Sequence, residues 1–179
     1  MAGYNIKREI SEAYLRLIKT KDGDKITVKD LFQECGVSRQ TFYYHFRDLM
    51  DVIEYSLRGI LDDVVQECAK MDDPKDAIRH VLNTVIMNRS LIRRLETTSR
   101  HKEIEKIVAT ALHDTMAAIL DIHDSDYRHL PKNDRETLLE FFSFGILGFV
   151  LSHLDDKNMD VDKLTDQLFR IYSGELKLL

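Results

Sequence analysis

The strongest constraint on the fold is the spacing of apolar residues, which repeats with the period of an α-helix through almost the whole chain. Apolar side chains three and four residues apart line one helix face, whereas a strand needs alternation with a period of two. No stretch alternates for long enough to predict a sheet, and two prolines and seven glycines in 179 residues disfavour a loop-rich β fold. We therefore predict an all-α fold of about nine helices.

Capping and turn residues divide this pattern near the N-terminus. Thr27 carries a hydroxyl and is followed three residues later by Asp30, which is the pairing of a helix capping box. Gly36 is placed to end the helix that starts there, and Ser38 is placed to cap the next one. Pro74 suits the first turn of a later helix. The sequence thus predicts two short helices between residues 27 and 47.

The distribution of charge permits a nucleic-acid partner, although the formal net charge is −5. Residues 1–60 hold ten basic and nine acidic side chains, whereas the remainder holds sixteen basic and twenty-two acidic ones. The N-terminal third is therefore spared the acidity of the rest of the chain, which allows DNA binding without demonstrating it.

Several other classes of protein lack support in the sequence. The N-terminus is charged and amphipathic, unlike a signal peptide, and the longest apolar run, 141–151, is too short to cross a bilayer. The lone residues Cys35 and Cys68 suit a reduced, cytoplasmic setting. No phosphate-binding glycine loop, CxxC pair or nucleophile elbow occurs, and the histidines lack regular ligand spacing. We therefore expect no catalytic residues, no cofactor, no metal site and no membrane partner.

The informative segment is 27–47, TVKDLFQECGVSRQTFYYHFR, which has the layout of a helix-turn-helix. In its second helix Phe42 and Phe46 are four residues apart and should face the core. This leaves the following side chains on the outer faces: Arg39, Gln40, Thr41, Tyr43 and Tyr44. Tyrosine hydroxyls suit phosphate oxygens. The alternative is that both tyrosines pack against the following long helix and that Arg39 is only a solvated surface charge.

This segment resembles the N-terminal motif of the TetR/AcrR (tetracycline-repressor) family of bacterial transcriptional regulators. The matching residues are Thr27, Val28, Asp30, Gly36, Val37, Ser38, Thr41, Tyr43, His45 and Phe46. The resemblance covers about the first 60 residues and implies a DNA-binding domain at 1–50 and a larger effector-sensing and dimerisation domain at 51–179. It also implies a sequence-specific regulator, more often a repressor, that binds a palindromic operator in double-stranded DNA as a homodimer.

The resemblance further implies which residues contact DNA. These are Thr27, Ser38, Arg39, Gln40, Thr41, Tyr43, Tyr44, His45 and Arg47. Arg39, Gln40 and Thr41 take the positions that reach base edges, where arginine can bind guanine and glutamine can bind adenine in bidentate fashion. Phe32 departs from the family pattern, which usually has alanine where the two helices approach closely.

The C-terminal region offers a candidate dimer interface. The helix expected from Asn133 to about Leu154 follows a polar loop at 123–133 and is apolar on nearly all sides, so it cannot face water around its circumference. Its small residues allow another helix to approach, and the last helix would complete the interface. The candidate residues are Gly145, Gly148, Ser152, Leu164 and Leu168. The alternative is that this helix is the centre of the monomer core.

The signal that controls such a regulator is open at the sequence level. A small apolar effector could bind a pocket lined by Met87, Met116, Phe141, Phe142 and Phe144, but the same spacing would equally make a closed core. Segment 142–150 weakly resembles the branch of the family that includes activators of dihydroxyacetone kinase operons, where a regulatory protein partner can supply the signal. The rival functions are a helical protein-interaction module with a vestigial helix-turn-helix and a small helical enzyme.

Overall fold

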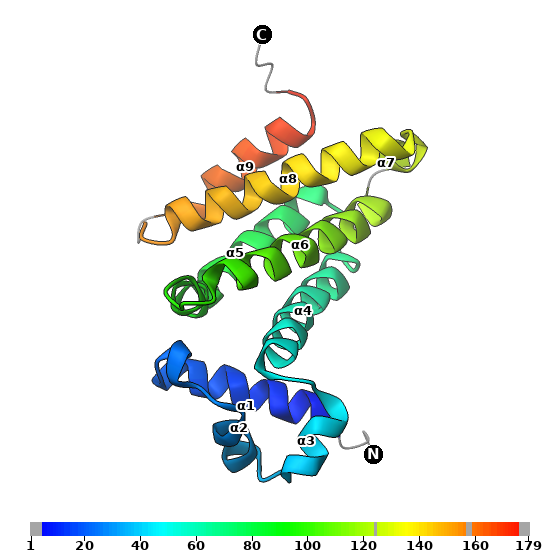
Figure 1. The fold of residues 1–179 in the computed structure, drawn as a ribbon. Helices are drawn as coiled ribbons and strands as arrows, with labels where there is room; N and C mark the ends of the chain where they lie inside the picture. The colour runs from blue at the N-terminus through cyan, green and yellow to red at the C-terminus, as the bar shows by residue number, and fades with distance from the viewer. Residues whose placement is uncertain (1–4, 124, 157–158, 176–179) are drawn as a thin grey trace. The chain divides into compact units, whose positions relative to one another are not determined.

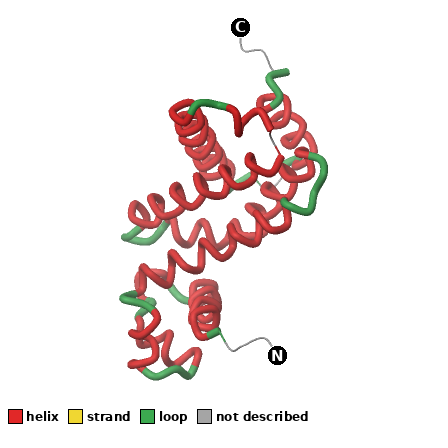
Figure 2. The backbone as a smooth tube through the Cα atoms, turned by 90° about the vertical axis from the view of Figure 1, so that its right-hand side faces the viewer, coloured by secondary structure: helices red, strands yellow, loops and turns green. Residues whose placement is uncertain are grey.

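The computed structural model describes residues 5–123, 125–156 and 159–175, and this part of the chain contains α-helices, one short 3-10 helix and no strand (Figure 1, Figure 2). The all-α prediction is confirmed. The elements are α1 (Ile6–Thr20), η1 (Gly23–Lys25), α2 (Val28–Cys35), α3 (Arg39–His45), α4 (Leu49–Cys68), α5 (Pro74–Glu96), α6 (His101–His123), α7 (Ser125–His129), α8 (Lys132–His153) and α9 (Val161–Tyr172).

The predicted loop at 123–133 is wrong in part, because α7 lies within it. Its one aromatic residue, Tyr127, is buried and packs in a cluster with Leu120 and Leu139. A helix of only five residues has no periodicity that a sequence can display, so burial of Tyr127 rather than a local pattern accounts for it.

The chain forms two compact units that are discontinuous in sequence. The first comprises Met1–Ile60 and Ser90–Val108, and the second comprises Leu61–Arg89 and Ala109–Leu179. The boundary after residue 50 expected from the family resemblance remains a prediction about domains. The compact units add a different division, in which the end of α5 and the start of α6 belong with the N-terminal helices.

The first unit has one apolar core, to which the two separate stretches of chain both contribute. Leu91 and Leu95 of α5 and Ile104 of α6 are buried in the same cluster as the N-terminal helices. The buried members from the N-terminal stretch are Ile10, Ala13, Tyr14, Ile18, Ile26, Leu31, Phe42, Phe46, Met50, Val52, Ile53 and Leu57. The hydroxyl of Ser11 also donates to Ser56 at 2.8 Å inside this core, joining α1 to α4. The helix-turn-helix is therefore held from several sides.

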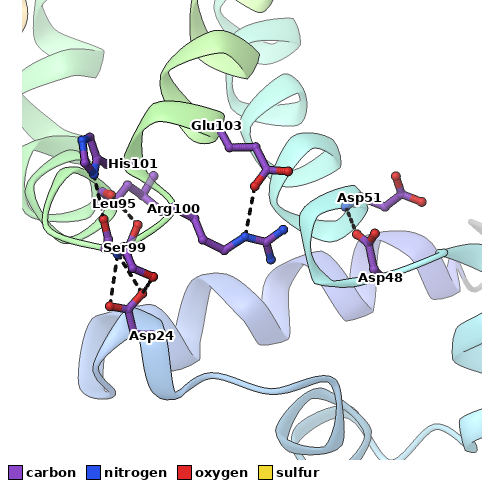
Figure 3. Close-up of polar contacts among 9 residues, drawn as sticks. Asp24, Asp48, Asp51, Leu95, Ser99, Arg100, His101 and Glu103 are labelled. Carbon is purple, nitrogen blue, oxygen red and sulfur yellow. Dashed lines mark hydrogen bonds and ion pairs between the residues drawn. The ribbon is translucent and has the colours of Figure 1, made fainter.

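A polar and steric contact fastens η1 to the turn between α5 and α6. The carboxylate of Asp24 accepts hydrogen bonds from the backbone N–H of Ser99 at 2.9 and 3.1 Å and from its hydroxyl at 2.9 Å (Figure 3). Beside it, a Cβ on Gly23 would lie 2.5 Å from Cγ2 of Thr98 and 3.1 Å from Cδ1 of Ile18. Glycine is therefore required here by close approach.

In the second unit, α5 and α9 are joined by charged side chains. Lys75 pairs with Asp166 at 3.0 Å, Arg79 pairs with Asp162 at 3.1 Å, and the Lys75 ammonium lies 5.0 Å from the centre of the Phe169 ring. Exposed ion pairs of this kind contribute little stability individually. They mark the face of α9 that lies toward α5.

Replacing Gly23 should test the close approach of η1 to the α5–α6 turn. Gly23→Ala should lower the free energy of unfolding by about 1–3 kcal/mol, the usual range for an inserted methyl group in a packed site. The Thr98 side chain cannot easily turn away, because its hydroxyl donates to the carbonyl of Leu95 at 2.9 Å. Urea unfolding followed by circular dichroism measures the effect.

Two comparisons make this test specific. Gly59→Ala is the matched control, because a Cβ there meets nothing within 4 Å and alanine favours a helix by about 1 kcal/mol. Thr98→Ser removes the methyl group that obstructs the new Cβ, so Gly23→Ala should cost much less in that background. Equal costs in both backgrounds would contradict the proposed clash.

Candidate DNA-binding surface

Local caps fix both ends of the turn between α2 and α3. At the start of α2 the Thr27 hydroxyl accepts from the Asp30 N–H at 3.3 Å, while the Asp30 carboxylate accepts from the Thr27 N–H at 2.7 Å. The predicted capping box is confirmed. Gly36 ends α2 with a φ of 68°, a left-handed conformation that favours glycine, and Ser38 caps α3 by accepting from the Thr41 N–H at 3.0 Å.

The inner side of α3 is aromatic and buried. Phe42 is 0% exposed and Phe46 is also buried, which confirms the prediction that both face the core. The Phe42 ring packs against Phe46 and edge-on against Phe32 of α2, with centroids 5.9 and 5.3 Å apart. These contacts orient the other side of α3 outward.

The outer side of α3 carries the predicted DNA-contacting side chains. Arg39, Gln40, Tyr43 and Tyr44 are exposed, whereas Thr41 is half-buried. At 85% exposure, Tyr44 is not packed against α4, which removes the alternative reading for that residue. The two remaining members of the set near this helix, Ser38 and His45, are exposed and half-buried respectively.

Three of the hydroxyls predicted to contact DNA already form hydrogen bonds within the protein. The Thr27 hydroxyl lies 2.6 Å from Oδ2 of Asp30, and the Thr41 hydroxyl lies 2.7 Å from the Ser38 hydroxyl. These hydroxyls stabilise the helix starts, so a contact from Thr41 to a base edge would compete with its bond to Ser38. The side chains of Arg39 and Gln40 are exposed and need break no such hydrogen bond to reach DNA.

Arg47 is exposed, but its guanidinium forms a forked contact with the carboxylate of Asp51, and its backbone N–H donates to Asp51 at 2.9 Å. This pairing raises the pKa of Arg47 and lowers the pKa of Asp51. Asp48 caps the start of α4 by accepting from the Asp51 N–H at 3.0 Å (Figure 3). Arg47 is therefore held in place before any phosphate approaches, and Asp51 offsets its charge.

Sequence reasoning missed two side chains around α3. The ammonium of Lys7 in α1 lies 5.5 Å from the centre of the Phe46 ring and 5.7 Å from that of Tyr55, which places a positive charge next to the end of α3. Phe32, noted only as a departure from the family pattern, contacts both Phe42 and Tyr43. No local spacing signals either contact, because each joins separate helices.

The candidate interface residues of the second unit lie largely on the surface of the single chain. Gly145, Gly148 and Ser152 of α8 are exposed, and Leu164 and Leu168 of α9 are half-buried. The glycines share one helix face with Phe141 and Phe144, which are 73% and 62% exposed. This face of α8 is therefore not part of the monomer core, contrary to the alternative that the whole helix is its centre.

The residues expected to line an effector pocket are not gathered by the single chain. Met87 is 84% exposed on α5, and Phe141 and Phe144 point outward from α8. Met116 is half-buried against the cluster around Tyr127, and the ring centroids of Phe141 and Phe142 lie 5.7 Å apart on α8. The spacing predicts which residues share a helix face, but it does not show which of these faces other parts of the same chain bury.

The capped turn, the buried inner face and the exposed polar outer face define a helix-turn-helix, the motif of a class of DNA-binding proteins. Two family models match the chain: "Bacterial regulatory proteins, tetR family" over residues 10–51 and "Transcriptional regulator C-terminal region" over residues 72–174. The chain belongs to the TetR family of bacterial transcriptional regulators, as its motif had indicated.

Individual relatives are distant but match nearly the whole length of the chain. An HTH-type transcriptional regulator of Staphylococcus aureus, SAB2452, is 19% identical over 96% of this chain and 94% of its own. Among solved structures, the dihydroxyacetone kinase operon activator DhaS has a TM-score of 0.68 at 15% identity, covering 97% of both chains. The TetR family repressor AlkX from Dietzia sp. has a TM-score of 0.60 at 14% identity, covering 99% and 98%. These structures share the fold.

The capping box at the start of α2 predicts a specific pH dependence. Hydrogen bonds from Lys21 and Thr27 lower the pKa of Asp30 to about 2. A carboxylate with a lowered pKa stabilises the folded state above its ordinary pKa, and this contribution is lost as the pH falls toward the lowered value. Asp30→Asn should therefore cost about 1 kcal/mol of unfolding free energy at pH 7, and its difference from wild type should shrink between about pH 4 and pH 2.

Urea unfolding at a series of pH values measures this dependence. Asp62→Asn, at an exposed position of α4, is the matched control and should follow the wild type throughout. A constant difference between Asp30→Asn and wild type down to pH 2 would show that the carboxylate charge is not what stabilises the start of α2.

Proposed function

We propose that this regulator binds an inverted-repeat operator as a homodimer, with α3 of each subunit in the major groove. The observation that carries the proposal is the two-sided construction of α3, whose aromatic inner face is fixed in the core and whose polar outer face is exposed. A recognition helix must be held rigidly from behind so that its outer side chains meet base edges in a defined register.

Within this surface we assign base reading to Arg39 and Gln40 and backbone contacts to the remaining residues. Both base-reading side chains are exposed near the start of α3, the end of a recognition helix that contacts base edges. Tyr43, Tyr44 and Arg47 follow at the other end, where hydroxyl and guanidinium groups can donate to phosphate oxygens. The remaining residues lie at or near helix ends, where they can contact the DNA backbone: Thr27, Ser38, Thr41 and His45.

The dimer is supported by the composition of α8. This helix of 22 residues is long and apolar enough to cross a membrane by length and composition alone, yet only 22% of its most apolar window is buried within the chain. An apolar face of this kind needs a covering partner, and a second copy supplies one through an isologous interface. Phe141 and Phe144, expected at an effector pocket, are reassigned to this interface because they flank Gly145 and Gly148 on the same face.

We further propose a cytoplasmic repressor, since a dimer seated on an operator blocks transcription by occupancy alone. The structural neighbours include both an activator, DhaS, and a repressor, AlkX. Transcription of a reporter joined to the bound operator decides the sign: repression requires higher expression when the regulator gene is deleted. We assign no effector to the candidate pocket residues, because Met87, Phe141 and Phe144 are exposed in the single chain.

Changing single side chains of α3 should separate base reading from backbone contacts. Gln40→Ala should change the preference at one base position of each half-site by about 1–3 kcal/mol, which is the value of a bidentate contact. Tyr44→Phe removes a hydroxyl from an exposed side chain and should weaken all sequences to a similar degree. The measurement is fluorescence anisotropy with genomic fragments selected for binding and with single-base variants of them.

Gln66→Ala, at an exposed position of α4 outside this surface, is the matched control and should bind like the wild type. Identical losses from Gln40→Ala on every base variant would contradict its assignment to base reading.

Substituting Gly148 should break the dimer without unfolding the subunit. A Cβ at Gly148 meets nothing within 4 Å in the single chain, so Gly148→Gln has space in the monomer. In the proposed interface the same side chain would be forced between two closely packed helices and would leave a polar group buried. Light scattering and sedimentation should then report a folded monomer. Gly59→Gln has the same free space on α4 and should stay dimeric.

A further inference from the structure

Phe32 in α2 contacts the recognition helix at an aromatic cluster of three rings. Its ring lies edge-on to Phe42 and to Tyr43, with centroids 5.3 and 6.5 Å apart, and Phe42 and Tyr43 are themselves edge-on at 5.3 Å. Phe42 is fully buried, Phe32 is half-buried and Tyr43 is exposed. The cluster thus extends from the core to the surface of α3.

A positively charged side chain lies over the ring of Tyr43, the exposed member of this cluster. The guanidinium carbon of Arg39 lies 5.4 Å from the centre of the Tyr43 ring, within the range of a cation–π contact. Arg39 and Tyr43 are four residues apart on α3, so their side chains share one face of the helix. No ion pair of Arg39 is present in the described part of the chain, which leaves the Tyr43 ring as its observed contact.

We propose that Phe32 is a positioning residue for base recognition: it holds the Tyr43 ring, and that ring holds the guanidinium of Arg39 at the start of α3. This inference rests on the base-reading role of Arg39 in the proposed function. An arginine side chain free in water samples many rotamers, and bidentate recognition of guanine requires one of them. Stacking on a fixed ring reduces this freedom before the DNA arrives.

The arrangement of the rings lets Phe32 of α2 act on Arg39 through Tyr43. Tyr43 is exposed, so its ring would be free to turn if Phe42 were its only neighbour. Phe32 adds a second edge-on contact from another helix, and two such contacts define the ring plane more closely than one. The plane of Tyr43 in turn decides where the guanidinium of Arg39 can stack.

The first test needs no DNA. Protons on the Arg39 side chain, assigned by NMR in the whole protein, should show the ring-current shift of a group lying over an aromatic ring. Phe32→Leu keeps an apolar side chain but removes the ring, and it should reduce this shift, as should Tyr43→Leu. Phe32→Tyr retains the ring and should preserve the shift. An unchanged Arg39 shift in a folded Phe32→Leu protein would overturn the inference.

The second test measures base preference with the selected genomic fragments. Arg39→Ala identifies the base position that Arg39 reads. Phe32→Leu should reduce discrimination at that same position several-fold and leave discrimination at the Gln40 position unchanged. Phe32→Tyr should restore the wild-type preference. Packing damage alone would weaken binding to all sequences instead, so a uniform loss, or a loss that Phe32→Tyr does not restore, contradicts the positioning role.

The two tests separate failure of the inference from failure of the proposed function. If Arg39→Ala changes no base preference, the assignment of Arg39 to base reading is wrong, and the inference falls with it. If Arg39→Ala does change the preference but Phe32→Leu does not, the proposed function stands and the role of Phe32 is overturned. Thermal melting of each variant confirms that the proteins compared are folded.

Discussion

Burial of Phe42 is the interaction on which the reading surface depends. α3 has seven residues, and a helix this short has little stability of its own in water. Its position is fixed because the Phe42 side chain is completely enclosed by the core of the first unit. Once that ring is enclosed, the helical geometry turns Gln40 and Tyr44, which lie two residues before and after Phe42, to the opposite side of α3. Specificity on the outside is thus a consequence of packing on the inside.

The two units differ in how much of their apolar surface they bury. In the first, fifteen buried hydrophobic residues form a single cluster, and the exposed side is polar and aromatic. In the second, the buried clusters are smaller, and two phenylalanines of α8 remain open to solvent beside exposed glycines. A closed core gives rigidity, which DNA reading requires. An uncovered apolar helix gives a surface that association with a second subunit can bury.

The sequence predicted what depends on neighbours along the chain. Thr27 and Ser38 cap the helices as expected, and the four-residue spacing placed Phe42 in the core. It missed what depends on distant contacts, such as α7 and the packing of 90–108 with the N-terminal helices. Periodicity also identifies an apolar face without saying what covers it, which is why Phe141 was expected in a pocket and is exposed instead.

The discontinuity of the first unit has a consequence for how the protein is made and how it can be recombined. Leu91, Leu95 and Ile104 complete a core whose other members precede residue 60, so this core cannot close until about a hundred residues have left the ribosome. A chimera joined at the end of α3 would pair one parent's recognition helix with another parent's supporting residues. A DNA-binding unit transferred to another protein must therefore include segment 90–108.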